Sequence, residues 1–412
     1  MTSTAPAPIV ALGYRDYRIF WLASIVSNVG SLASLTALGW VVKETTDSAW
    51  RVTLVAVAGL LPLAVAGPIG GGLADRMRRR DLLAMSLALQ AVFAVLVAVV
   101  VWRLDDPYWL LFALSLLGGF VASLGSPVQQ AIVTELVPPQ HLRNAISLNS
   151  SQWNTSRAIG PLLAGALIAA VGAVWVFWIN AISFLVMVGA LFLIPARPVA
   201  SGTGESFVQI IRSGMRYAFR SPGIRACLLA GGIVGLLLAP LTWLIAVIAT
   251  DGFDTGEGEF GVLASSFGFG ALIGAVVLVF IEQHFPHRQV VITALFVMSA
   301  FVTLLGMVPA LWMGVVVLFL TGVAFTPAVS TVVAAMQAHA EDAYRGRVMS
   351  LWLMWFGMVS PVAVIVQGVV AEVASIEIAL MATGVIAAAV TLVFVLGGGH
   401  RAIDPPAPVI AH

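Results

Sequence analysis

The sequence predicts an all-α polytopic membrane protein whose twelve transmembrane helices form two pseudo-symmetric six-helix bundles. Its 412 residues are 60% hydrophobic and only 9% charged, with a mean hydropathy of +1.03. Ordinary soluble proteins are about 25% charged, so this composition leaves too little polar surface to cover a soluble fold. Apolar stretches long enough to cross a bilayer recur along the chain, and features of the first half return in the second.

Twelve apolar runs are the expected spans. They cover residues 18–42, 52–74, 82–103, 108–134, 145–171, 174–195, 225–249, 260–281, 289–308, 311–338, 348–371 and 377–396. Several are longer than a bilayer core requires, which allows tilt but fixes no angle. The first 13 residues lack a charged n-region and a clear cleavage site, so we expect the first run to be a retained span.

The arginines indicate which side of the membrane each connection faces. If the N-terminus is cytoplasmic, sixteen arginines fall in inside segments, whereas the outside segments hold only Lys43, Arg51 and Arg103. Positive charges accumulate on the cytoplasmic side of membrane proteins. We therefore expect a multi-pass protein of the cell (inner) membrane with both termini in the cytoplasm.

The longest break between apolar runs divides the chain into two halves. The predicted units are an N-terminal bundle at 1–195, a cytoplasmic linker at 196–224, and a C-terminal bundle with a short cytoplasmic tail at 225–412. Within the linker, Arg212, Arg216 and Arg220 recur every four residues beside apolar positions, which indicates a short amphipathic helix. That helix either lies on the inner leaflet, with its arginines toward anionic headgroups, or is a solvated linker.

The two halves repeat the same features at similar positions. Pro127 and Pro327 each follow a small hydroxyl residue and are 200 positions apart, and Ser147 and Ser350 each precede a leucine and are 203 positions apart. A period of half the chain, interrupted by a central linker, indicates two bundles related by pseudo-symmetry.

The segment 71–83, between the second and third runs, places Asp75 and four arginines in a chain that has few charges. Such a cluster cannot lie in lipid, so we expect a tight turn at the membrane surface. It resembles the signature loop of the major facilitator superfamily, G-x-L-A-D-R-x-G-R-R-x-x-L. The matching residues are Gly71, Leu73, Ala74, Asp75, Arg76, Arg79, Arg80 and Leu83, and Arg78 replaces the expected glycine.

With twelve spans and the half-chain repeat, the resemblance covers essentially the whole sequence and implies the major facilitator fold. The stretches 14–21 and 135–149 are similar to the bacterial branch of enterobactin exporters and Tap-like drug efflux pumps, which also includes lysophospholipid carriers.

The resemblance implies an inner gate. Its expected members are Gly71, Asp75, Arg76, Arg79, Arg80 and Glu135. Asp75 would face the N-terminal dipole of the eleventh span, where an anion is favoured, and Arg79 would reach Glu135 at the inner end of the fourth span. These contacts would latch the outward-open state and break as the cytoplasmic side opens. Alternatively the cluster is chiefly a topology anchor, which explains the arginines but not Asp75.

The resemblance also implies that the first, fourth, seventh and tenth spans line a central cavity, and polar residues at helical spacing favour this independently. The candidate lining residues are Asn28, Ser31, Gln129, Gln130, Gln152, Trp153, Arg157, Trp243, Thr326, Ser330, Trp352, Trp355 and Met358. Buried amides need hydrogen-bond partners, and aromatic and methionine side chains adapt to apolar ligands. Small hydroxyl residues also serve helix packing and tryptophans also form interfacial belts, so these alternatives stay open.

The fifth span carries the one arginine that lies well inside a predicted span, away from its ends: Arg157. A charge there is costly, so Arg157 is expected to face the bundle interior or water, unless it snorkels or pairs with an acid at the inner surface. Gly160, Pro161 and Gly165 incompletely resemble a Gly-Pro motif of facilitator-family antiporters that is typical of exporters. Proline bends a helix and glycine allows close packing, so we expect these residues to form an interface hinge.

No Asp or Glu lies clearly in the middle of a predicted span. Proton-driven transporters usually need a carboxylate whose pKa is tuned by burial. The candidates for proton coupling are Glu135 and Asp75, and Glu135 is favoured because it ends a cavity-lining span.

The sequence therefore predicts a transporter that exports amphipathic small molecules, such as drugs or siderophore-like metabolites, by alternating access and proton antiport. The alternative is a lysophospholipid or metabolite carrier or uptake transporter of the same fold, and a remote one is a membrane enzyme or receptor.

The net charge of +1 argues against a nucleic-acid partner. The sequence has no ATP-binding loop, H-E-x-x-H motif or Cys/His cluster, so we expect no enzymatic activity, no metal and no cofactor besides a proton gradient. The expected partners are a lipophilic or amphipathic substrate and membrane lipids, with the protein as a monomer.

Overall fold

The computed structural model describes residues 9–74, 77–197, 207–341 and 344–404. The long helices of the N-terminal half are α1 (Arg15–Thr46), α2 (Ala49–Ala74), α3 (Arg79–Arg103), α4 (Tyr108–Leu136), α5 (Leu142–Val171) and α6 (Ala173–Phe192). Those of the C-terminal half are α8 (Pro222–Trp243), α10 (Glu257–Ile281), α11 (His287–Leu305), α12 (Leu311–His339), α13 (Arg345–Val373) and α14 (Ile376–Leu396). The shorter elements are η1 (Val10–Gly13), η2 (Pro139–His141), α7 (Phe207–Arg220), α9 (Ile245–Val247), η3 (Ile248–Gly252) and η4 (Gly399–Ile403).

Eleven helices in the described part of the chain are long and apolar enough to cross a membrane. The twelfth long helix is α2, with 26 residues, although the apolar part recognised within the described residues, Ala49–Leu63, is shorter. The predicted all-α membrane fold is therefore confirmed.

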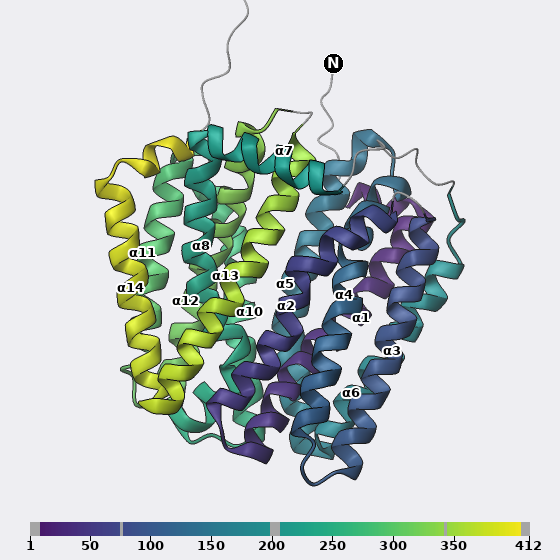
Figure 1. The fold of residues 1–412 in the computed structure, drawn as a ribbon, viewed down its shortest axis with the longest axis vertical. Helices are drawn as coiled ribbons and strands as arrows, with labels where there is room; N and C mark the ends of the chain where they lie inside the picture. Colours follow the sequence, from purple (N-terminus) through teal and green to yellow (C-terminus); the bar gives the residue numbers. More distant parts are fainter. Residues whose placement is uncertain (1–8, 75–76, 198–206, 342–343, 405–412) are drawn as a thin grey trace, which may run out of the picture.

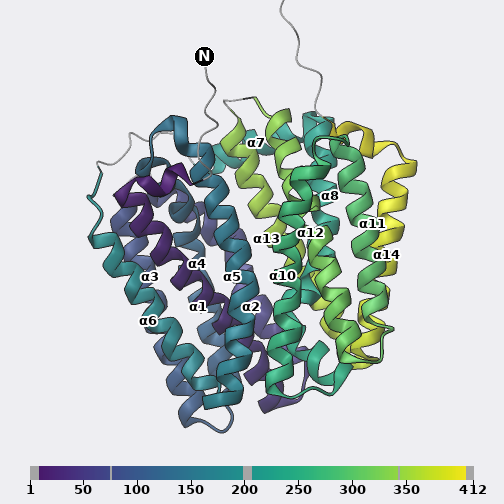
Figure 2. The same cartoon turned by 180° about the vertical axis from the view of Figure 1, so that it is seen from behind.

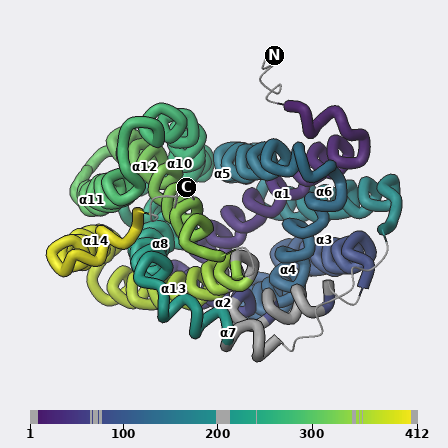
Figure 3. The backbone as a smooth tube through the Cα atoms, turned by 90° about the horizontal axis from the view of Figure 1, so that it is seen from above, coloured from purple at the N-terminus to yellow at the C-terminus, as the bar shows by residue number. Residues whose placement is uncertain are grey.

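The two halves stand side by side, as Figures 1 and 3 show. We call the end at which α1 begins the terminal face; it also carries α7 and lies at the top of Figure 1. The opposite end, where α1 and α13 finish, is the distal face. Short connections make successive long helices run alternately between these two faces.

Two pairs of helices make the most extensive contacts between the halves. α2 lies beside α13 (Figure 1) and α5 lies beside α10 (Figure 2). Small residues let these backbones approach: a methyl group added at Gly165 of α5 would overlap the backbone of Gly261 in α10, and one added at Gly368 of α13 would overlap Thr53 of α2. Close packing of this kind is what associates helices in lipid, where apolar surface gains nothing by leaving the hydrocarbon.

Proline and glycine cooperate where α5 meets α10. Pro161 has no amide hydrogen, so the carbonyl of Arg157 one turn earlier loses its helical donor. Gly268 of α10 lies directly against that carbonyl, and a side chain at this position would collide with it. The same arrangement recurs beside the proline of α12, where Gly274 lies against the carbonyl of Val323. α10 thus approaches both neighbours at the carbonyls that the prolines leave free.

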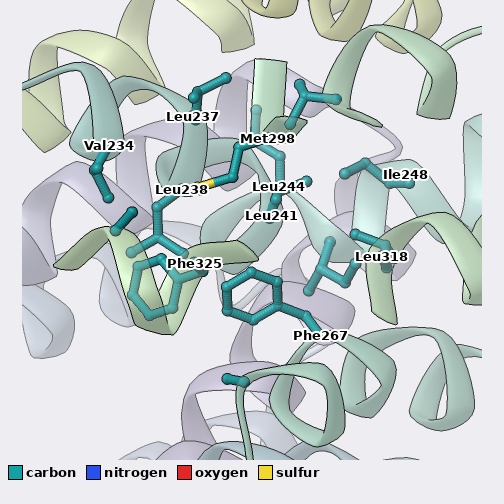
Figure 4. Packing of buried hydrophobic residues seen from close by; sticks show 14 of the residues in the cluster. Val234, Leu237, Leu238, Leu241, Leu244, Ile248, Phe267, Met298, Leu318 and Phe325 are labelled. Atoms are coloured by element: carbon teal, nitrogen blue, oxygen red, sulfur yellow. The ribbon is translucent and has the colours of Figure 1, made fainter. Parts of the chain in front are cut away.

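The core of the C-terminal half is built from apolar side chains of α8, α10, α11 and α12, as Figure 4 shows. Phe267 of α10 packs against Phe325 of α12 with ring centroids 5.3 Å apart. Large apolar side chains also cover the outer surface, for example Val393 and Leu396 of α14. An apolar exterior is what a bilayer requires of helices that face it.

The seventh predicted span, 225–249, is not one continuous helix, because α8 ends at Trp243 and is followed by α9 and the π-helical turn η3. Pro240 removes the amide that would bond the carbonyl of Leu236. The side-chain amide of Gln367 in α13 donates to that carbonyl at 3.0 Å. A side chain from another helix therefore satisfies the carbonyl that Pro240 leaves without its helical donor.

The amphipathic helix predicted in the linker is present as α7, and it packs on the end of the C-terminal half. Gly214 lies against Arg347 and Leu351 of α13. Tyr217 stacks on Tyr344 with ring centroids 4.4 Å apart and planes 1° apart. Residues 198–206 and the side chains of 207–212 lie outside the described part, so the orientation of the predicted arginine row toward lipid stays a prediction.

Candidate functional site

The predicted inner gate contains an ion pair within the N-terminal half. The Nη1 atom of Arg79, at the start of α3, lies 3.0 Å from the Oε1 atom of Glu135 near the end of α4. The same nitrogen also donates to the carbonyl of Ala131 at 3.4 Å. The expected Arg79–Glu135 contact is therefore present at the terminal face, with both side chains partly buried.

The neighbouring Arg80 ties α3 to the end of α6. It lies 2.8 Å from the carboxylate of Asp81 and donates to the carbonyl of Ile194 at 3.2 Å. Its guanidinium lies 5.6 Å from the ring centroid of Phe192. These contacts agree with the topology-anchor alternative for this arginine.

The remaining gate residues cannot be placed. Asp75 and Arg76 lie outside the described residues, and Gly71 is described only as part of the α2 backbone. The expected contact between Asp75 and the start of α13 therefore stays a prediction.

A buried cation joins the halves at the distal face. Lys43, near the end of α1, is 5% exposed, and its Nζ lies 2.7 Å from Asp47 and 2.8 Å from Asp251 in η3. Asp47 ends α1 in the left-handed conformation, at φ +46°, which turns its carboxylate back toward Lys43. The hydrogen bond from Lys43 holds the pKa of Asp47 below its usual value, so Asp47 is ionised at neutral pH.

A second polar contact crosses between the halves nearby. Glu372, at the end of α13, accepts hydrogen bonds from the Ser48 hydroxyl at 3.0 Å and from the Trp50 amide at 2.9 Å. The Trp50 amide is one of the free donors at the start of α2, so Glu372 caps that helix. We call Lys43, Asp251 and Glu372, with their partners, the distal latch.

The Arg79–Glu135 pair, by contrast, joins two helices of the same half. It is intact in a structure whose halves are linked at the distal face. The expectation that this pair breaks as the terminal side opens stays a prediction. The pair alone cannot hold the two halves together, because neither member belongs to the C-terminal half.

An interior cavity of about 240 Å³ lies among α1, α2, α3, α4 and the end of α8. Two predicted cavity residues, Ser31 and Trp243, line it. Gln90 and Asn180 line it as well; they were missed because they belong to the third and sixth spans, and the available signal was an amide within an apolar run. Drug-sized ligands occupy pockets of about 300–1,000 Å³, so this cavity must widen to accept one.

The polar residues of α5 divide between two sides of the helix. Gln152 is buried, at 2% exposure. Trp153, in contrast, is 44% exposed. One turn further along, the guanidinium of Arg157 lies over the ring of Phe325 in α12, 5.3 Å from its centroid. Trp153 and Arg157 therefore lie on the side of α5 that faces the other half.

Several other predicted cavity residues serve packing. Thr326 is buried and donates to the carbonyl of Ala271 in α10 at 2.8 Å. Trp352 packs against Gly231 of α8, and Trp355 donates through Nε1 to the carbonyl of Leu228 at 2.8 Å. These two tryptophans thus join α13 to α8, and neither lines the cavity described above.

Met358 is exposed and begins a stripe along the outer surface of α13 that reaches the distal end. The stripe continues through Val362, Val366, Val369 and Val373. Its regular spacing and its length place Met358 toward lipid, so its assignment to the cavity is corrected. Among the other candidates, Asn28 is buried, Gln129 and Ser330 are half-buried, and Gln130 is exposed.

The predicted hinge residues lie at two contacts. Gly165 and the Pro161 carbonyl face Gly261 of α10, so they belong to the interface between the halves. Gly160 packs against Leu32 and Ala33 of α1, within its own half. The expected interface position is therefore correct for two of the three residues and wrong for Gly160.

The paired bundles and their seams define an integral multi-pass membrane protein with the major facilitator fold. Residues 4–398 match the family described as transmembrane secretion effector, and the chain belongs to this family.

Similar curated proteins include the multidrug efflux pump Tap of Mycolicibacterium fortuitum, 24% identical over 93% of both chains. Macrolide efflux protein A of Streptococcus pyogenes is 24% identical over 87% of this chain and 91% of that protein. The enterobactin exporter EntS of Escherichia coli O1:K1 is 25% identical over 82% and 80% of the two chains.

Solved structures share the fold at low sequence identity. A POT family transporter superposes with a TM-score of 0.77 at 12% identity, covering 93% of this chain and 96% of that one. A point mutant of the nucleoside transporter NupG gives 0.76 at 12%, covering 94% and 100%. A bacterial homologue of the lysosomal transporter Spinster, inward-facing and unoccupied, gives 0.67 at 16%, covering 96% and 99%.

Proposed function

We propose that the protein exports amphipathic small molecules, such as drugs or siderophore-like metabolites, from the cytoplasm by alternating access. The three relatives are named as a multidrug pump, a macrolide efflux protein and an enterobactin exporter, and each aligns over most of its length. The positive-inside rule favours a cytoplasmic terminal face, because the arginine clusters lie there.

The observation that carries this proposal is the change in exposure along the interior side of α5. Ala164 and Ile168, toward the distal face, are buried, whereas Trp153 and Ile146, toward the terminal face, are exposed. Helical geometry of 3.6 residues per turn places all four on one side. This side of α5 is thus more accessible toward the terminal face than toward the distal face, which supports a state open to the terminal side, one of the two that alternating access needs.

Export against a gradient needs an energy source, for which we propose proton antiport with Glu135 as the coupling acid and Asp75 as a second acid. Protonation of Glu135 would release Arg79 and loosen the contact between α3 and α4. Coupling would then come from the different solvent access of this carboxylate in the two states.

Everted membrane vesicles that contain the protein test this function. A panel of lipophilic dyes, macrolides and catechol siderophores should be taken up into the vesicles when respiration energises them, and a protonophore should abolish the uptake. Transport of headgroup-labelled lysophospholipid without any dye transport would favour the lipid-carrier alternative. Absence of transport for every probe would overturn the proposal.

A further inference from the structure

Arg157 is a cation in the middle of the membrane that has no acidic partner among the described residues. It lies halfway along the 30-residue helix α5, too far from either end for its side chain to reach the membrane surface. Among the described residues, every Asp and Glu lies in a connection or within a turn of a helix end. The ion pairs of the described chain do not include Arg157.

The position of Arg157 on α5 is interior. Ile159 and Leu162 are exposed on the lipid side, Gly160 packs on α1, and Gly165 packs on α10. Arg157 falls between the α1 and α10 contacts, opposite the lipid side, and its guanidinium lies over Phe325 of the other half. It therefore stands where the exposed part of this side of α5 ends and the buried part begins.

The known contact does not use the hydrogen-bonding capacity of this side chain. A charged residue at the bilayer centre is costly unless it is paired or faces water. The Phe325 ring offsets part of this cost through a cation–π contact, but it accepts none of the five N–H groups in a directional bond. A structural arginine at this depth would be expected to pair with a buried acid, and in the described chain it does not.

We propose that Arg157 binds the anionic group of the transported substrate, and that the protein therefore selects anionic or zwitterionic amphipaths over cations. The planar guanidinium would hold a carboxylate, or a similar oxyanion, through two parallel hydrogen bonds. Trp153, one turn nearer the terminal face, would pack against the aromatic or apolar body of the same molecule. This inference rests on the proposed export function, since it names the class of substrate.

Binding to the purified protein in nanodiscs of zwitterionic lipid tests the proposal separately from transport. The probes are two xanthene dyes of similar size, a carboxylate-bearing fluorescein and a cationic rhodamine ester, followed by fluorescence anisotropy. Wild type should bind the anionic dye at least about tenfold more tightly. Arg157→Gln should weaken that binding about tenfold to one-hundredfold, as loss of a charge-assisted pair does, and leave cation binding unchanged or stronger.

Two further variants exclude a general loss of structure or charge. Arg157→Lys keeps the charge without the planar fork, so it should restore part of the affinity. Arg143→Gln removes an exposed arginine from the start of the same helix and should leave anion binding unchanged. Equal affinity of wild type for both dyes, or no binding of either, would overturn the proposal. Anion binding that needs Arg157 in a protein that transports neither dye would support the site while contradicting the export function.

Discussion

Lys43 contacts one acid from each half of the chain, and this makes it the residue on which the distal latch depends. Its ammonium group is buried, whereas Asp251 is 38% exposed and Asp47 is 93% exposed. Removal of Lys43 would therefore leave two carboxylates that water can solvate. The change should weaken the link between the halves without lowering the free energy of unfolding by much.

Replacing Lys43 with Met should favour the distal-open state by about 1.5–3 kcal/mol, the usual contribution of a hydrogen bond to a charged group. A cysteine at Val42, which is buried and lines the interior cavity, would then react with an impermeant maleimide from the distal side in a Cys227→Ala background. Asp47→Asn is the matched control and should have a much smaller effect, because exposed ion pairs contribute little. Equal labelling of the wild-type and Lys43→Met proteins would contradict the latch.

The ion pair between Asp47 and Lys43 should not change over the physiological pH range. The folded-state pKa of Asp47 is lowered, so its contribution is present above the ordinary pKa of an aspartate and is lost only as pH falls through the lower folded value. The difference in Val42 cysteine labelling between the Asp47→Asn and the parent protein should therefore be the same at pH 6 and at pH 8.

Glu135→Gln should abolish transport driven by a pH gradient while sparing substrate counterflow. Glutamine keeps the shape of the side chain, but it is uncharged, so it neither takes up a proton from the pH gradient nor forms an ion pair with Arg79. The measurement is initial uptake into proteoliposomes under each condition. Active export at the wild-type rate in this variant would exclude Glu135 as the coupling acid.

At the scale of elements, the seam between α5 and α10 depends on glycine. Replacement of glycine by alanine inside a helix usually stabilises it by about 0.5–1 kcal/mol. At Gly165 the added methyl group would meet the backbone of Gly261, so overpacking of about 1–3 kcal/mol should outweigh that gain.

Gly165→Ala should therefore lower the melting temperature by a few degrees and slow transport at least about tenfold, with normal membrane insertion. Gly189→Ala is the matched control, because Gly189 lies in α6 and an added methyl group would find nothing within 4 Å. The control should keep its activity and match or exceed wild-type stability. Indistinguishable behaviour of the two variants would show that the seam tolerates a larger residue.

Hydropathy predicted the spans well because a bilayer imposes an apolar run on each helix that crosses it. The run 108–134 corresponds closely to α4. The break after Trp243 was missed because the apolar run continues through it. The carbonyl of Leu236, which Pro240 leaves without its helical donor, accepts instead from Gln367, 131 positions away. The residues near Pro240 do not indicate which distant side chain will be the partner.

The site was predictable only where a residue pattern fixed the geometry. Arg79 and Glu135 were paired in advance because the loop resembles a known signature, and the side of α5 followed from helical spacing. Lys43 was expected only as an outside cation, because its contact with Asp251 depends on how two separate halves meet. Trp352 and Met358 were assigned to the cavity by residue type, which does not tell a helix contact or a lipid-facing surface from a cavity wall.

For the whole molecule, the central claim is that the halves close at one face as they open at the other. Double electron–electron resonance measures this directly with two pairs of spin-labelled cysteines at exposed positions that span the halves. Asp105 with Met307 reports on the distal face, and Gln140 with Ala338 reports on the terminal face. Addition of substrate with acidification should lengthen the distal distance and shorten the terminal distance in the same sample. Two distances that stay fixed, or that change in the same direction, would contradict alternating access.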